Sequence, residues 1–156
     1  MRFRQAVEGT PGLQSTYRRG LQAVRTRDKR KIICRDGANV AGSVNIDAAL
    51  ERELPSGPRW DYAIGMIGRS NQDRIVWIEV HPASSSDVKV VLAKLDWLTG
   101  WLAITATKLR RLENKKVWLA TGPVAIPKGS RQARWLASKG LRFPRSHVVL
   151  EDVWQQ

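Results

Sequence analysis

The chain has 156 residues, 42% of them hydrophobic, and its 27 lysines and arginines against 14 aspartates and glutamates give a formal net charge of +13. This length predicts a single domain, residues 1–156 with a core over about 13–150, and the apolar content excludes a disordered basic tail. One cysteine and two histidines are too few ligands for a Cys/His zinc site.

The sequence also bears on location and partners. No stretch approaches the ~18 consecutive apolar residues that span a bilayer, and no apolar segment of a signal peptide follows the basic start. We therefore expect a cytoplasmic protein without membrane contact. The positive charge favours a nucleic-acid partner, DNA more than RNA, and nothing in the sequence indicates an oligomeric state.

The N-terminal part is predicted to hold one helix and two short strands. Pro11 occupies the favoured first position of a helix, and large apolar residues recur at helical spacing after it as far as Leu21. The apolar run 31–34 and the alternating pattern of 40–47 predict two short strands.

A β-hairpin is the clearest element in the middle of the chain. The runs 60–65 and 75–81 have the apolar, β-branched and aromatic composition of strands, and a short polar turn near Ser70 and Asn71 separates them. With the turn centred there, antiparallel pairing places Asp61 across from the end of the second strand.

Three polar side chains are predicted to meet at that end of the hairpin. Glu79 and His81 lie two apart on the second strand and therefore share a face of it, close to Asp61 on the first. Either carboxylate alone is better explained by pairing with a surface arginine. Their convergence favours a cation between them, and Mg²⁺ prefers such oxygen ligands.

The second half of the chain alternates helices and strands. A serine cluster introduces a long helical pattern over 87–112, and a buried strand is predicted at 117–120. A helix at 130–139, closed by Gly140, and a last strand at 147–150 follow. The predicted fold class is α/β (α+β), with a mixed sheet flanked by helices.

Lys94 has an unusual position on the long predicted helix. It lies about 140° from the polar arc, beside Trp97 and Trp101, so its ammonium group must extend to solvent or meet a partner. We expect the two tryptophans to belong to the core rather than to a base-stacking platform. The apolar arc consists of Val88, Val91, Leu95, Leu98, Leu102 and Leu109.

Over about Tyr17 to Ala120 the sequence resembles the PD-(D/E)XK nucleases, the restriction-endonuclease-like proteins. Their αβββαβ core carries an aspartate on one hairpin strand and Glu-x-Lys on the next, and here Asp61 is followed by Glu79-Val80-His81. The departures are His81 in the place of the lysine and a tryptophan, not a proline, before Asp61.

The resemblance implies roles for these residues. Asp61 and Glu79 would bind Mg²⁺, with Mn²⁺ as an alternative, and His81 would stand where the family's lysine orients or deprotonates the attacking water. Imidazole can act as a general base near neutral pH. In some members the lysine comes from the helix after the third strand, which makes Lys94 the candidate. The alternative is that Lys94 only borders a packed helix.

Asp47 is a further candidate ligand, at the end of the strand before the hairpin. It is predicted either to add a third carboxylate to the site or to cap the helical turn that follows it.

The sequence thus predicts a metal-dependent nuclease, or alternatively an inactive nuclease-fold module that binds nucleic acid or a protein. Lys128, Arg131 and Arg134 would extend its basic surface. The residues expected to contact phosphates are Arg18, Arg19, Arg25, Arg27, Lys29 and Arg30.

Overall fold

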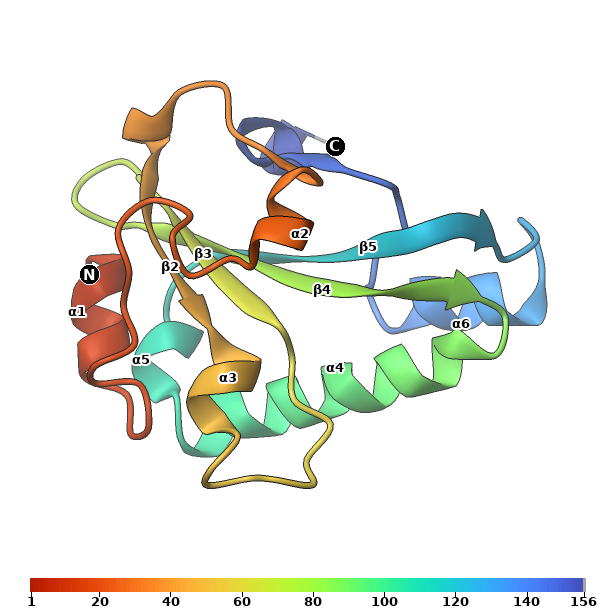
Figure 1. Cartoon of the computed structure of the whole chain (residues 1–156), viewed down its shortest axis with the longest axis horizontal. Coiled ribbons are helices and arrows are strands. Elements are labelled where there is room, and N and C mark those ends of the chain that lie inside the picture. The colour runs from red at the N-terminus through yellow and green to blue at the C-terminus, as the bar shows by residue number, and fades with distance from the viewer. Residues whose placement is uncertain (156) are drawn as a thin grey trace.

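A four-stranded mixed sheet forms the centre of the computed structural model, which describes residues 1–155 (Figure 1). The strands lie in the order β2–β3–β4–β5, with the first three antiparallel and β5 parallel to β4. Helices pack against this sheet, which confirms the predicted mixed α/β class. The strand bounds are β2 (Val40–Asn45), β3 (Tyr62–Met66), β4 (Arg74–Ser84) and β5 (Asn114–Ala125).

The parallel pairing of β4 and β5 follows from the long helix α4 (Asp87–Ile104), which carries the chain back along the sheet. The prediction that this helix continues to residue 112 is wrong. Ala106 leaves the helical conformation with φ −97° and ψ 49°, and a short α5 (Thr107–Arg110) follows. Its predicted apolar arc is confirmed, since every member from Val88 to Leu109 is buried.

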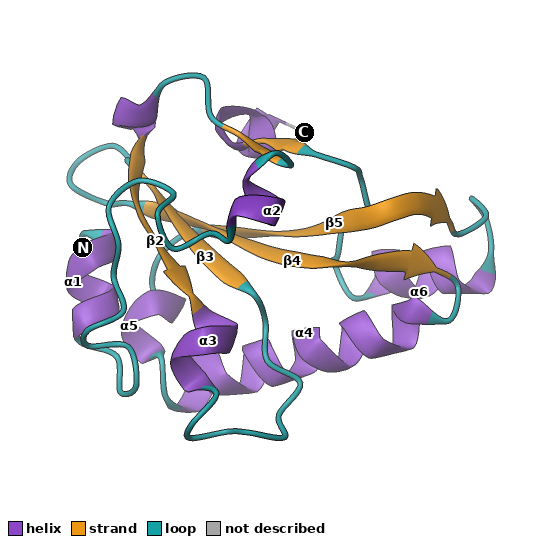
Figure 2. Cartoon of the chain, viewed as in Figure 1, coloured by secondary structure: helices purple, strands orange, loops and turns teal. Residues whose placement is uncertain are grey.

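Alternation along the strands gives the sheet two apolar faces. Ile75 and Trp77 of β4 point toward α4, whereas Val76 and Ile78 point to the opposite face. The α4 face is also covered by α1 (Phe3–Glu8), α3 (Ile46–Leu50) and α6 (Arg131–Ser138), as Figure 2 shows. Within residues 1–155, no helix combines the length and apolar character needed to cross a bilayer.

The opposite face carries α2 (Thr26–Lys29) and a small second sheet. In this sheet β1 (Ile32–Ile33) pairs in parallel with β6 (Val148–Val149), so the predicted strands at 31–34 and 147–150 exist but are shorter and pair with each other. Short 3₁₀ helices, η1 (Gly37–Asn39) and η2 (Leu150–Gln155), flank them.

The predicted helix beginning at Pro11 is wrong. The N-terminal helix is α1, and the chain from residue 10 to residue 24 consists of turns and bends with one isolated β-bridge, between Arg18 and Ser43 of β2. Gly12 and Gly20 have φ of +89° and +51°, a left-handed conformation that no helix includes. The apolar spacing there reflects packing, since Leu13 is fully buried and Tyr17 lies against Phe3.

The pairing of β4 with β5 is interrupted just after His81. Partners run from His81 with Ala120 to Ala83 with Val124, so three residues of β5 lie opposite the single Pro82. Proline lacks the N–H group of a ladder bond, and an insertion of this kind bends the strand that carries it.

Two glycine substitutions test the packing of α1 on the sheet. A Cβ on Gly65 of β3 would lie 2.3 Å from the Phe3 ring, whereas a Cβ on Gly100 of α4 would meet nothing within 4 Å. We expect Gly65→Ala to lower the free energy of unfolding by about 1–3 kcal/mol through overpacking. Gly100→Ala is expected to raise it by roughly 0.5–1 kcal/mol. Urea unfolding measures both, and equal shifts would contradict this account of the packing.

Candidate functional site

Four of the predicted polar side chains lie close together, two on β4, one on the facing turn of α4 and one just before β3. The Lys94 Nζ atom is 2.6 Å from Glu79 Oε2, and the Nδ1 atom of His81 is 3.7 Å from the same oxygen. At the start of β3, Asp61 Oδ2 accepts a hydrogen bond of 2.9 Å from the Val80 main-chain N–H. The hairpin register and the helical projection therefore converge on one place.

Glu79 is the most deeply buried charged group of this cluster, with 0% of its surface exposed. Burial, reinforced by the nearby charge of Asp61, raises the pKa of Glu79 to about 8, although Lys94 opposes the shift. Its second oxygen, Oε1, has no hydrogen-bond partner among residues 1–155. The carboxyl group thus has one oxygen that is paired and one that is free to accept.

Asp61 is positioned by the main chain of the neighbouring strand. Burial raises its pKa above the ordinary value, and the hydrogen bond from Val80 and the charge of Lys94 act against that rise. The pKa values of Asp61 and Glu79 are therefore both raised, and Lys94 is the cation that counteracts both shifts.

His81 lies between two carboxylates. Its Nε2 atom is 3.4 Å from Asp87 Oδ1, on the first turn of α4. Burial and the charge of Lys94 lower the pKa of His81, which favours the neutral imidazole that a general base requires. The sequence pattern identified Asp87 only as part of the start of α4, because nothing in the spacing indicates that the chain turns back toward His81 there.

Asp47 is held by arginines. Its Oδ1 atom accepts a hydrogen bond of 3.1 Å from Arg59 Nε, and its Oδ2 atom is 3.9 Å from the nearest guanidinium nitrogen of Arg25. The expectation that Asp47 caps the following turn is wrong, because the cap is Asn45, whose Oδ1 accepts from the Ala48 N–H. Its charge nevertheless reaches the site, where it raises the pKa of Asp61.

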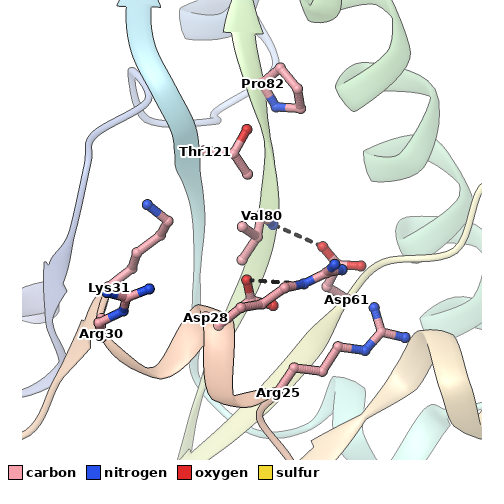
Figure 3. Close-up of a pocket in the computed structure, with 9 residues that line it drawn as sticks. Arg25, Asp28, Arg30, Lys31, Asp61, Val80, Pro82 and Thr121 are labelled. Atoms are coloured by element: carbon pink, nitrogen blue, oxygen red, sulfur yellow. Dashed lines mark hydrogen bonds and ion pairs between the residues drawn. The ribbon is translucent and has the colours of Figure 1, made fainter.

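A pocket of about 560 Å³ adjoins Asp61 on the face of the sheet opposite α4 (Figure 3). Of the six predicted phosphate contacts, Arg25, Arg27 and Arg30 line it, whereas Arg18 borders a separate depression. Arg19 and Lys29 are exposed and border neither hollow. The remaining lining residues are Asp28, Lys31, Asp61, Val80, Pro82 and Thr121.

The basic wall of this pocket is anchored by a buried pair that the sequence pattern did not identify. The hydroxyl of Tyr62 donates to Asp28 Oδ2 at 2.5 Å and accepts from the Arg25 N–H at 3.3 Å. Because Tyr62 directly follows Asp61, this contact fixes α2, and with it the arginines, beside the carboxylate. Asp28 is the only acidic residue in the cationic run 25–31. A single carboxylate in such a run is the sequence signal that could have indicated its structural pairing.

Comparisons with known proteins add nothing to this geometry. No protein-family model matches the chain, and neither a curated protein nor a solved structure does so. Among residues 1–155, no group of three or more His, Cys, Asp and Glu side chains has the arrangement of a metal site. The chemistry must therefore be inferred from two carboxylates, a lysine and an imidazole.

The raised pKa of Glu79 predicts how stability depends on pH. Between its ordinary value of 4.5 and about 8, the folded protein holds a proton that the unfolded chain releases, so stability falls as pH rises through this window. We expect the free energy of unfolding of the wild type to decrease by a few kcal/mol relative to Glu79→Gln, since one pKa unit corresponds to ~1.4 kcal/mol. Urea unfolding of both proteins from pH 5 to pH 8 measures the difference, and parallel curves would contradict the prediction.

The pairing of Lys94 with Glu79 gives a second prediction. Above pH 8, Lys94→Met is expected to cost up to about 3–5 kcal/mol, because it leaves a buried carboxylate without its cation. The cost should shrink near pH 5, where Glu79 carries a proton. The double variant Lys94→Met with Glu79→Gln serves as the control and should recover most of the stability at high pH, as measured by thermal unfolding.

Proposed function

We propose that the chain is a metal-dependent nuclease that hydrolyses phosphodiester bonds with a restriction-endonuclease-like core. One observation carries the proposal: Lys94 Nζ lies 2.6 Å from Glu79 Oε2. In the motif Glu79-Val80-His81, His81 occupies the position where the family has lysine. Lys94, from the helix after the third strand of the meander, supplies an ammonium group to the Glu79 carboxylate instead. The meander β2–β3–β4, the helix α4 and the parallel strand β5 support the same reading.

The carboxylates fit a Mg²⁺ or Mn²⁺ ion on the chemistry of their oxygens. Glu79 Oε1 is buried without a partner among the described residues. Burial raises the pKa of both carboxyl groups, and the charge of Asp61 raises that of Glu79 further, a penalty that a cation relieves. Asp61 and Glu79 would hold the ion. When bound, it would supply a water of lowered pKa and a positive charge beside the phosphodiester.

The chain's own groups then have separate tasks. The ammonium group of Lys94 holds Glu79 and orients the attacking water, and the neutral imidazole of His81 accepts a proton while Asp87 fixes its other nitrogen. The guanidinium groups of Arg25, Arg27 and Arg30 bind the phosphates on either side of the scissile bond. The substrate chain would occupy the pocket beside Asp61.

A second candidate function is an inactive module with the same fold that binds nucleic acid without cleaving it. Two observations favour it. Glu79 is fully buried and already paired with a cation, and His81 stands where the family has lysine. The basic pocket would bind nucleic acid in either case. An assay of cleavage, and not one of binding, therefore distinguishes the nuclease from the inactive module.

Cleavage is tested with plasmid, single-stranded DNA and RNA, each with Mg²⁺, Mn²⁺ or EDTA. We expect metal-dependent cleavage that falls about 100-fold or more in Glu79→Gln and in Lys94→Met, since each variant removes a group that acts on the metal or the water. Measurements near pH 6 keep Lys94→Met folded. Arg69→Gln, which alters an exposed arginine in the turn at the start of β4, is the matched control and should cleave normally.

Tight, salt-dependent binding without cleavage under any metal would overturn the nuclease proposal in favour of the binding module. Cleavage that persists unchanged in Glu79→Gln would place the chemistry elsewhere.

A further inference from the structure

We propose that α6 carries a second nucleic-acid contact, a platform of Arg131, Arg134 and Trp135 on which an unpaired base stacks. The inference rests on the proposed function only in taking nucleic acid as the partner, and it does not require cleavage. The helix lies at the end of the sheet toward which β4 and β5 run (Figure 1), away from the α2 wall of the pocket.

Trp135 is the exposed tryptophan of the chain. Trp60, Trp77 and Trp118 are fully buried, whereas Trp135 is 41% exposed, the only one of the seven among the large apolar side chains that lie open to solvent in residues 1–155. Because the indole of Trp135 is already exposed, a ligand can contact its π-face without any rearrangement of the core. Aromatic faces of this kind are what single-stranded nucleic acids use for base stacking.

The stripe around Trp135 is arranged on one face of the helix. Arg131, Arg134, Trp135 and Ser138 follow the spacing i, i+3, i+4, i+7 and together line an open depression of about 460 Å³. Leu136 faces the other way and is buried in the core shared with α4. The stripe therefore lies outside the core that Leu136 joins, and the guanidinium group of Arg134 donates a hydrogen bond to the Gly129 carbonyl at the start of the helix.

Charge assigns an anionic occupant to this depression. The stretch 114–150 contains eight lysines and arginines and no aspartate or glutamate, so no carboxylate of the stretch can pair with Arg131 or Arg134. The first turn of α6 has no acidic residue, and Arg131 at its first position meets the positive end of the helix dipole, which disfavours its charge until an anion arrives. A phosphate backbone supplies that anion and a base supplies the partner of the indole.

The chain itself connects this platform with the pocket. Thr121 of β5 lines the pocket beside Asp61, and the exposed stretch 122–125 leads on to the loop before α6. Because α6 packs on the α4 face, a nucleic-acid strand that leaves the pocket along β5 passes the ends of β4 and β5 to reach it. It can stack on Trp135 only if its bases are unpaired. The substrate class is accordingly single-stranded nucleic acid, or a duplex with a single-stranded flank.

Binding in EDTA tests the platform without cleavage. The probe is a fluorescein-labelled oligo(dA) of about 16 nucleotides, with a duplex of the same length as comparison. Trp135→Ala is expected to weaken single-strand binding about fivefold or more and duplex binding much less, since stacking contributes ~1–3 kcal/mol per base. Trp135→Phe should retain most of the affinity. Arg131→Gln and Arg134→Gln should each reduce the salt slope by about 0.7.

Arg69→Gln, an exposed arginine outside α6, controls for charge alone and should leave the preference for the single strand unchanged. Wild-type single-strand affinity in Trp135→Ala, or an equal loss for single strand and duplex, would overturn the proposal. So would competition by poly-glutamate as effective as that by the oligonucleotide, which would indicate an acidic protein partner. Should Trp135→Ala fail to unfold cooperatively, the salt slopes of the arginine variants decide. Absence of cleavage in the wild type would leave these outcomes unaffected.

Discussion

The burial of the Glu79 charge is the constraint on which the site depends. A carboxylate without solvent contact is costly unless a cation or a proton accompanies it, and the fold provides Lys94 on the facing turn of α4. The long strand β4 and the long helix α4 must therefore keep their relative register, because a shift by one turn would remove the ammonium group. The pairing uses Glu79 Oε2, and Oε1 has no hydrogen-bond partner among residues 1–155.

The strand and helix periods explain why much of the site was predictable from sequence. A strand period of two places Glu79 and His81 on one face, and the hairpin register sets Asp61 beside Val80. A helical projection placed Lys94 away from the polar arc of its helix, and the resemblance in the hairpin motif made it a candidate for the site. These patterns are local, because each depends only on the period of one strand, one hairpin or one helix. They hold here because β3, β4 and α4 are regular elements with buried apolar residues.

Other parts depend on contacts between distant segments, which the local patterns do not contain. Apolar spacing after Pro11 indicated a helix, but those side chains fill a gap against α1 and its glycines adopt left-handed conformations. The contact of Asp87 with His81 depends on how sharply the chain turns from β4 into α4, and the pairing of Asp28 with Tyr62 joins segments over thirty positions apart. The strands β1 and β6 likewise pair with each other in a separate sheet and not with the main sheet, which no local pattern indicates.

The irregularity opposite Pro82 also sets a direction. Because three residues of β5 lie opposite this single proline, the ladder between β4 and β5 loses its regular bonds and β5 bends there. Beyond the bend, β5 leads to α6, whose Leu136 is buried in the core shared with α4. The insertion of residues 121–123 therefore decides how the end of β5 leaves the sheet, and with it where α6 begins.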